Sequence, residues 1–154
     1  HRTERIDSIE VTCIDVAVPM VIVPAAAVGC SGHETKAELD ANAPLIARLD
    51  RMRVEAGLRM GLGDCSALVV PKPVLVAAPA GSGSIASRDF VPFNCHATYS
   101  VTGSIALSVA CRIGGTVASR LSRPQAAAPG LVSIEHPGGV IDVGVRLRES
   151  GSEI

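Results

Sequence analysis

The sequence predicts one α+β domain whose strands surround a buried helix, and three observations support this. Runs of β-branched residues, typical of strands, lie near the start of the chain. A run that alternates apolar and polar residues, typical of a strand with one face in water, lies near its end. Between them, residues 94–113 are apolar or small in nearly every direction around a helix, which indicates a buried helix. With 154 residues the chain is long enough for one such core and short for two.

The first elements follow from local patterns. Ile9–Ile14 and Val18–Val23 are rich in β-branched residues and are expected to form two strands or one bent strand. Thr35 and Glu38 fit a capping box, in which the hydroxyl and the carboxylate bind free amides of a first helical turn. We therefore expect a helix to begin at that point.

A longer helix should follow. From about Asn42 to Gly61 or Gly63, apolar residues recur every three or four positions, which predicts an amphipathic helix that ends at a glycine. The apolar positions of this helix are Leu45, Leu49, Met52, Ala56 and Met60.

The second half of the chain is expected to add four strands and the buried helix. Val74–Ala78 and Ile85–Phe90 are short apolar strands, and the small residues 79–84 between them predict a flexible loop. Near the end, Leu131–Glu135 and Val140–Leu147 flank a Pro-Gly-Gly turn, which predicts a β-hairpin with one wet face.

The composition excludes several classes of function. Fourteen basic and fifteen acidic side chains, with no long run of one sign, argue against binding to nucleic acid or to an anionic membrane. The apolar stretch Val16–Val28 has only 13 residues and two prolines, whereas a bilayer span needs about 20 residues, and acidic residues precede it. Five cysteines form no C-x-x-C pair, which favours reduced thiols and a cytoplasmic protein.

The segment from Arg88 to His96 is the candidate site. It leads a predicted strand into the predicted buried helix, where free amides, the helix dipole and Arg88 would favour the carboxylate of a small organic acid. The same dipole would favour a thiolate at Cys95 and a neutral ring at His96, so either residue could transfer a proton. The alternative is purely structural: Asn94 caps the helix and Cys95 is buried.

Other kinds of site have less support. Cys95 and His96 together with His33 or His136 match no zinc spacing, so no metal is expected, and His33 and His136 are interpreted as ordinary loop residues. The chain lacks G-x-S-x-G, G-x-G-x-x-G and G-x-x-x-x-G-K, which argues against a serine hydrolase or a nucleotide-binding site. Lys72, between two prolines, is expected to be structural or solvated.

Eight short motifs, in order along the chain, resemble the PrpF-type isomerases and are most similar to the 4-oxalomesaconate tautomerases. The resemblance covers about residues 11 to 145. They are Ile14-Asp-Val-Ala-Val-Pro-Met-Val21, Gly29-Cys-Ser-Gly-His-Glu-Thr35, Ile46-Ala-Arg-Leu-Asp-Arg-Met-Arg-Val-Glu-Ala-Gly57, Arg59-Met-Gly-Leu-Gly-Asp64, Val70-Pro-Lys-Pro73, Cys95-His-Ala-Thr98 with Val101-Thr-Gly-Ser104, Gly115-Thr-Val117 and Ile134-Glu-His-Pro-Gly138.

The resemblance implies a diaminopimelate-epimerase-like fold, in which each of two pseudo-symmetric α+β domains has a curved mixed sheet around a central helix and the active site lies between the domains. It also implies isomerisation of unsaturated di- or tricarboxylic acids without a cofactor, such as a keto–enol or allylic proton shift. The implied catalytic residues are Cys95 and His96, and the implied substrate-binding residues are Arg88, Ala97 and Thr98.

The resemblance matches the second domain of this family alone. The family's Gly-Gly-Thr-Ser-Lys-like and Gly-Asn-Cys-Gly-like motifs belong to the first domain and are absent. We therefore expect residues 1–10 to lead into a C-terminal domain at 11–148 with a tail at 149–154, and activity to need a missing N-terminal domain or a second copy. The competing hypothesis is a catalytically silent domain that retains ligand binding or self-association.

Overall fold

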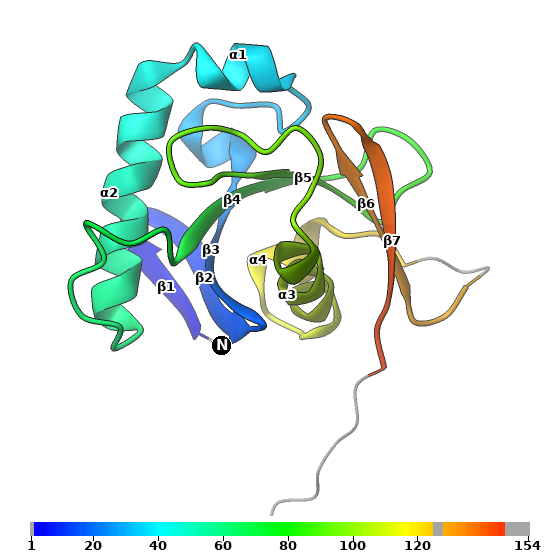
Figure 1. Ribbon diagram of the computed structural model, residues 1–154. Helices are drawn as coiled ribbons and strands as arrows, with labels where there is room; N and C mark the ends of the chain where they lie inside the picture. Colours follow the sequence, from blue (N-terminus) through cyan, green and yellow to red (C-terminus); the bar gives the residue numbers. More distant parts are fainter. Residues whose placement is uncertain (1, 125–127, 147–154) are drawn as a thin grey trace, which may run out of the picture.

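The computed structural model describes residues 2–124 and 128–146, and in these ranges seven strands form one mixed sheet with helices on both faces (Figure 1). The strands lie in chain order across the sheet; β3 runs parallel to β4 and β5 to β6, and the other neighbours are antiparallel. The predicted α+β class is confirmed. The elements are β1 (Arg2–Ile6), β2 (Ile9–Val16), β3 (Val18–Pro24), the 3₁₀ helix η1 (Ala25–Val28), α1 (Lys36–Asp40), α2 (Ala43–Arg59), β4 (Lys72–Ala77), β5 (Ile85–Asp89), α3 (Val101–Arg112), α4 (Val117–Leu121), β6 (Leu131–His136) and β7 (Gly139–Gly144).

Each face of the sheet has its own apolar core, because successive residues of a strand point to opposite faces. Val21 and Val23 of β3 pack with Leu49 and the other buried residues of α2. Met20 and Ile22, one position along, pack with α3 and α4 on the opposite face. The central strands are thus buried on both sides, which explains their continuous apolar sequences.

The sheet curves around α3. This helix contacts β2 and β3 as well as β6 and β7. Strands from both ends of the strand order therefore pack against the same helix. Figure 1 shows β6 and β7 turned out of the plane of β4 and β5 beside α3. Small side chains allow this close approach: Gly103, Ser104, Ala106, Ser108 and Ala110 are all buried.

The predicted start of the buried helix at residue 94 is wrong, because α3 begins at Val101. Residues 90–95 form a tight loop instead, in which Phe90 and Cys95 make an isolated β-bridge. The hydroxyl of Ser100 then caps α3 by accepting a hydrogen bond from the Gly103 amide at 3.2 Å. The helix is also less enclosed than predicted, since Val101 is 69% exposed and Ile105 38% exposed.

Most other elements confirm the local patterns. Thr35 and Glu38 form the predicted capping box of α1, and Asn42 caps α2. Arg2–Ile6, expected to precede the domain, is instead the edge strand of the sheet, and α4 was not predicted. The expected tail, and the last residue of the run to Leu147, lie outside the described residues.

None of the helices in residues 2–124 and 128–146 combines the length and apolar character that crossing a bilayer would require.

Candidate active site

Residues 90–100, between β5 and α3, form the centre of the candidate site. The loop is closed by hydrogen bonds from the Val91 amide to the Asn94 carbonyl at 2.9 Å and from the His96 amide to the Asp89 carbonyl at 2.7 Å. It lies between α1 on one side and the β6–β7 turn on the other, as its contacts below show. Cys95, His96, Ala97 and Thr98 therefore lie in a loop and not at the predicted start of a helix.

Arg88 joins three segments of the chain through its guanidinium. Its Nε donates to the Glu34 carbonyl at 2.7 Å, and Nη1 donates to the carbonyls of Ser87 at 2.9 Å and Glu135 at 3.3 Å. The residue is only 6% exposed, and burial lowers its pKa from the usual value. Because three of the five guanidinium N–H donors already bind carbonyls, little of Arg88 is left for a carboxylate ligand. Its positive charge remains beside the loop.

Cys95 lies beneath the surface with its thiol fully buried. Burial raises its pKa to about 11, with Asp40 acting in the same direction and Arg88 in the opposite one. The expected thiolate at a helix terminus is therefore not supported: α3 starts six residues later, and desolvation disfavours the charged form. At neutral pH Cys95 is a thiol, which can donate a proton and is poorly suited to accept one.

His96 and Ala97–Thr98 reach the surface next to Cys95. His96 is half-buried, and its Nδ1 accepts hydrogen bonds from the Thr98 amide at 3.2 Å and from the Thr98 hydroxyl at 3.3 Å. A neutral ring whose Nδ1 accepts carries its proton on Nε2. His96 therefore presents an Nε2–H donor in the neutral form.

His136, the last residue of β6, belongs to the same surface, although the sequence interpretation treated it as an ordinary loop residue. Its ring lies 6.4 Å from that of Tyr99, and its Nδ1 accepts from the Gly138 amide at 3.1 Å. A Cβ on Gly138 would lie 3.0 Å from the Ala97 carbonyl oxygen, so the turn and the loop are in close contact. Burial lowers the pKa of His136, as do the charges of Arg88 and His96. The motif Ile134–Gly138 was the available signal for this residue.

The small-residue loop 79–84 is tied to this region by Glu135. The carboxylate accepts hydrogen bonds from the amides of Ala80 at 2.8 Å, Gly81 at 2.9 Å and Gly83 at 2.9 Å. A Cβ on Gly83 would come within 2.6 Å of Glu135 Cγ, so only glycine allows this approach. The composition of residues 79–84 predicts a flexible loop, but Glu135, more than fifty residues away in sequence, restrains it through these hydrogen bonds.

A buried ion pair supports the start of α3. Asp89, which is fully buried, accepts from the Ser100 hydroxyl at 2.5 Å and lies 3.7 Å from Lys72 Nζ; Lys72 in turn donates to Ser100 Oγ at 3.0 Å. The expectation that Lys72 is structural agrees with this position, since its side chain is 12% exposed. The cluster fixes Ser100 and hence the orientation of the loop that precedes it.

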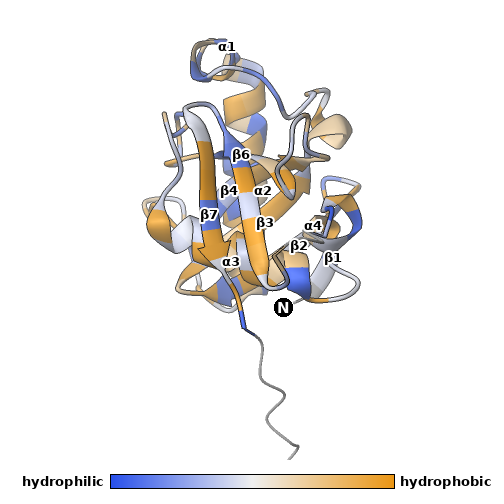
Figure 2. Cartoon of the chain, turned by 90° about the vertical axis from the view of Figure 1, so that its right-hand side faces the viewer, coloured by the Kyte–Doolittle hydropathy of each residue, from blue (hydrophilic) through white to orange (hydrophobic). Residues whose placement is uncertain are grey.

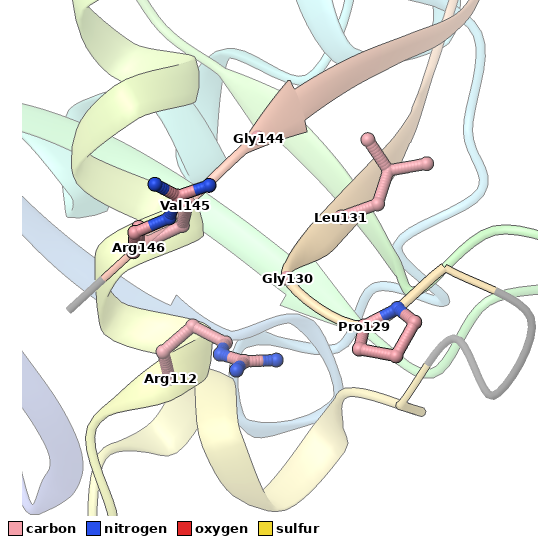
Figure 3. Close-up of a pocket in the computed structure, with 7 residues that line it drawn as sticks. All are labelled: Arg112, Pro129, Gly130, Leu131, Gly144, Val145 and Arg146. Carbon is pink, nitrogen blue, oxygen red and sulfur yellow. The ribbon is translucent and has the colours of Figure 1, made fainter.

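Other chemistry has little support in the described part of the chain. Within residues 2–124 and 128–146, no three His, Cys, Asp or Glu side chains are arranged to hold a metal ion. A hollow of about 830 Å³ does exist, but it lies at the other end of α3, between Arg112, Pro129–Leu131 and Gly144–Arg146 (Figure 3). Since 12 helical residues extend roughly 18 Å, this hollow is remote from the loop at the start of α3.

The arrangement around the loop can recognise a small anion and move protons. His96 and His136 each present an Nε2–H donor in the neutral form, and Arg88 adds positive charge from below; the Thr98 hydroxyl already donates to His96 Nδ1. Of the carboxylates nearby, Glu135 and Asp40 accept hydrogen bonds from backbone amides. Asp89 is fully buried; its Oδ2 binds the Ser100 hydroxyl, and its Oδ1 has no partner among the described residues. Donors without competing acceptors are the environment in which a carboxylate or a developing enolate is stabilised.

Comparisons with known proteins show the family to which the chain belongs. The family model described as "PrpF protein" matches residues 2–154. The protein YbhH of Escherichia coli K12 is 43% identical over 143 residues, covering 93% of this chain and 40% of YbhH. The 4-oxalomesaconate tautomerase of Pseudomonas putida KT2440 is 37% identical over 142 residues, covering 92% of this chain and 39% of that protein.

Two further matches agree with these. The (4E)-oxalomesaconate Delta-isomerase of Novosphingobium sp. KA1 is 36% identical over 154 residues, covering all of this chain and 43% of that protein. A crystal structure of methylitaconate-delta-isomerase superposes with a TM-score of 0.86 at 25% identity, covering 96% of this chain and 43% of that one. The chain thus spans about two fifths of the length of the relatives that it matches.

Proposed function

Because the chain belongs to the PrpF family, we propose that it contributes one side of the active site of a cofactor-independent isomerase that acts on unsaturated di- or tricarboxylic acids. The similarity to two oxalomesaconate isomerases, at 36% and 37% identity, is the observation that carries this proposal. The curved sheet around α3 supports a diaminopimelate-epimerase-like domain, as the family resemblance implies. Oxalomesaconate is the first candidate substrate, ahead of methylitaconate, because the relatives named for it are more similar in sequence.

The proposed reaction is an allylic or keto–enol proton shift. A base removes a proton from carbon, the double bond moves, and an acid returns a proton at the far end of the conjugated system, so no electrons are gained or lost overall. Both steps need donors that stabilise the intermediate enolate. The loop and the end of β6 supply such donors through the Nε2–H groups of His96 and His136.

Within the loop we assign different roles to the two residues proposed as catalytic. His96 is the accessible proton-transfer group, since its ring reaches the surface. Cys95 has a pKa of about 11 and is buried, so it would act as a proton donor after a small movement of the loop. Ala97 and Thr98 would contact a substrate carboxylate, with Arg88 acting through its charge from below.

We propose that a second surface completes this site. The relatives are more than twice as long as the chain, and the chain lacks the two family motifs of the first domain. Val101 and Ile105 of α3 are exposed beside the loop, and Figure 2 shows apolar residues along both α3 and β7 on this side. We propose that the remaining part of a PrpF-type protein, or a second copy of the chain, covers this face. Sedimentation that shows a clean monomer at micromolar concentration would count against a second copy.

The isomerase proposal can be tested by following the ultraviolet absorbance of 4-oxalomesaconate. The chain alone, the N-terminal part of the P. putida relative alone, and their mixture should be compared, with the His96→Ala chain as the matched control. We expect turnover in the mixture and a loss of at least about 100-fold with His96→Ala, the scale of general acid–base catalysis. Absence of turnover in every sample would reject the proposal for this chain.

The alternative function is a silent domain that binds a polycarboxylate without converting it. Titration calorimetry with tricarballylate distinguishes the two, because the silent domain would bind this compound and still give no turnover in the mixture.

A further inference from the structure

The motif from Gly29 to Thr35 and the helix α1 that follows it contain no residue proposed to touch the substrate, yet they lie directly against the candidate loop. The Glu34 carbonyl accepts from Arg88 Nε at 2.7 Å. The Glu34 carboxylate closes its own turn by accepting from the amides of Ser31 at 2.6 Å and Gly32 at 3.0 Å. The capping box then fixes the direction in which α1 leaves this turn. The segment is therefore a rigid support rather than a free loop.

Two side chains of α1, Asp40 and Lys36, bind the backbone amide and the backbone carbonyl of Cys95. Asp40 Oδ1 accepts from the Cys95 amide at 2.7 Å. Lys36 Nζ donates to the Cys95 carbonyl at 2.7 Å and forms an ion pair with Asp40 Oδ2 at 2.5 Å. Charged partners make both of these hydrogen bonds stronger than bonds between neutral groups.

The next residue is held from the opposite side. The His96 amide donates to the Asp89 carbonyl of β5 at 2.7 Å, so Cys95 and His96 are fixed between α1 and the sheet. Burial raises the pKa of Asp40, but the bonds from Lys36 and from the Cys95 amide lower it more, so the carboxylate is ionised at neutral pH. Asp40 is the centre of the arrangement, because it binds both Lys36 and Cys95.

We propose that Asp40, assisted by Lys36, is a positioning residue that holds the Cys95–His96 pair in the geometry of the candidate site. The contacts themselves are independent of any activity; their importance for catalysis rests on the function proposed above. Cys95 is itself part of the core on the α2 face, whereas the Asp40 side chain belongs to neither core. Loss of Asp40 should therefore release Cys95 locally and leave the rest of both cores in place.

The rate at which iodoacetamide alkylates each cysteine tests the proposal without substrate. A buried thiol reacts from a locally open state, so its rate reports the population of that state. Peptide mass spectrometry of the intact chain, alkylated under native conditions, resolves Cys95 from the buried Cys13 and Cys65, which serve as internal controls. With Asp40→Ala we expect Cys95 to react at least about tenfold faster, because a charge-assisted bond is lost, while Cys13 and Cys65 keep their rates.

The matched control is Glu55→Ala, which removes another ion pair between residues four apart, Glu55–Arg59 at 2.7 Å, on the neighbouring helix. It should leave all three rates unchanged. Asp40→Asn keeps an acceptor for the Cys95 amide and should give an intermediate rate; it also carries the test if Asp40→Ala does not fold. An unchanged Cys95 rate in both Asp40 variants, or a parallel rise at Cys13, Cys65 and Cys95, would overturn the proposal.

Discussion

Glu135 offers a sharp test of the structure because one carboxylate ties a glycine-rich loop to the candidate site. Replacement by alanine removes three hydrogen bonds, to the amides of Ala80, Gly81 and Gly83. The first two amides are at the surface and can bind water after the change, so each costs about 1 kcal/mol, and the partly buried third about 1–2 kcal/mol more. We expect the free energy of unfolding to fall by about 3 kcal/mol.

The assay is urea denaturation at pH 7, with Glu55→Ala as the control. That variant loses a surface ion pair and should change stability by less than about 0.5 kcal/mol. Glu135→Gln keeps a carbonyl oxygen for two of the amides but turns an amino group toward the third, so its loss should be intermediate.

The pH dependence of the stability difference between wild type and Glu135→Ala tests this reasoning. Burial raises the pKa of Glu135, but the three amides and His33 lower it more, so the folded pKa lies below the unfolded value of about 4.3. Its contribution to stability is therefore complete above about pH 4.3 and is lost as the pH falls through the folded pKa. A difference between wild type and Glu135→Ala that stays constant from pH 7 to the acid limit, or is below about 0.5 kcal/mol at pH 7, would contradict this reasoning.

Three further predictions follow from buried contacts. Arg53→Met should lower stability by about 3 kcal/mol in urea, because the fully buried guanidinium binds the carbonyls of residues 65 and 68, both at 2.9 Å; a loss below about 1 kcal/mol would argue against those bonds. Burial, followed by the charges of Arg88 and His96, lowers the pKa of His136 in the folded chain. The free energy of unfolding should therefore rise with pH just below about 6.5, and this rise should be smaller in His136→Gln. Equal slopes in the two proteins would contradict the burial of the ring. Gly83→Ala should destabilise the chain and lower the protection of the loop amides from hydrogen exchange, whereas unchanged protection would reject the close packing on Glu135.

Local patterns predicted the parts of the fold that local forces determine. The capping box at Thr35 and the amphipathic stripe of α2 need only neighbours within a few residues, and both are confirmed. The sequence patterns did not predict β1, because this strand lies at the edge of the sheet and carries exposed polar residues, so it has no apolar run.

The start of α3 could not be predicted from the sequence. Asn94 looks like a helix cap, but Ser100 serves instead because its hydroxyl binds Asp89, and that contact requires β5 and the loop to be in place. Likewise, the loop at 79–84 has a flexible composition, and only the folded sheet brings Glu135 against it.

The arrangement of the candidate residues could not be predicted from the sequence. Arg88 and Cys95 are buried, and Arg88 donates to the carbonyls of Glu34 and Glu135, which lie far away in sequence. His136 joins the site through the pairing of β5 with β6; the motif Ile134–Gly138 marks the histidine, but it does not reveal that pairing.

Incorporation of deuterium from solvent tests the central claim most directly, since the proposed reaction moves a proton to carbon. The mixture of this chain with the N-terminal part of the P. putida relative would be incubated with 4-oxalomesaconate in D₂O and the carbon-bound deuterium measured by NMR. The account predicts incorporation during turnover with the wild-type chain and its loss with His96→Ala. Turnover without incorporation, or equal incorporation with His96→Ala, would contradict the claim that this loop carries the proton transfer.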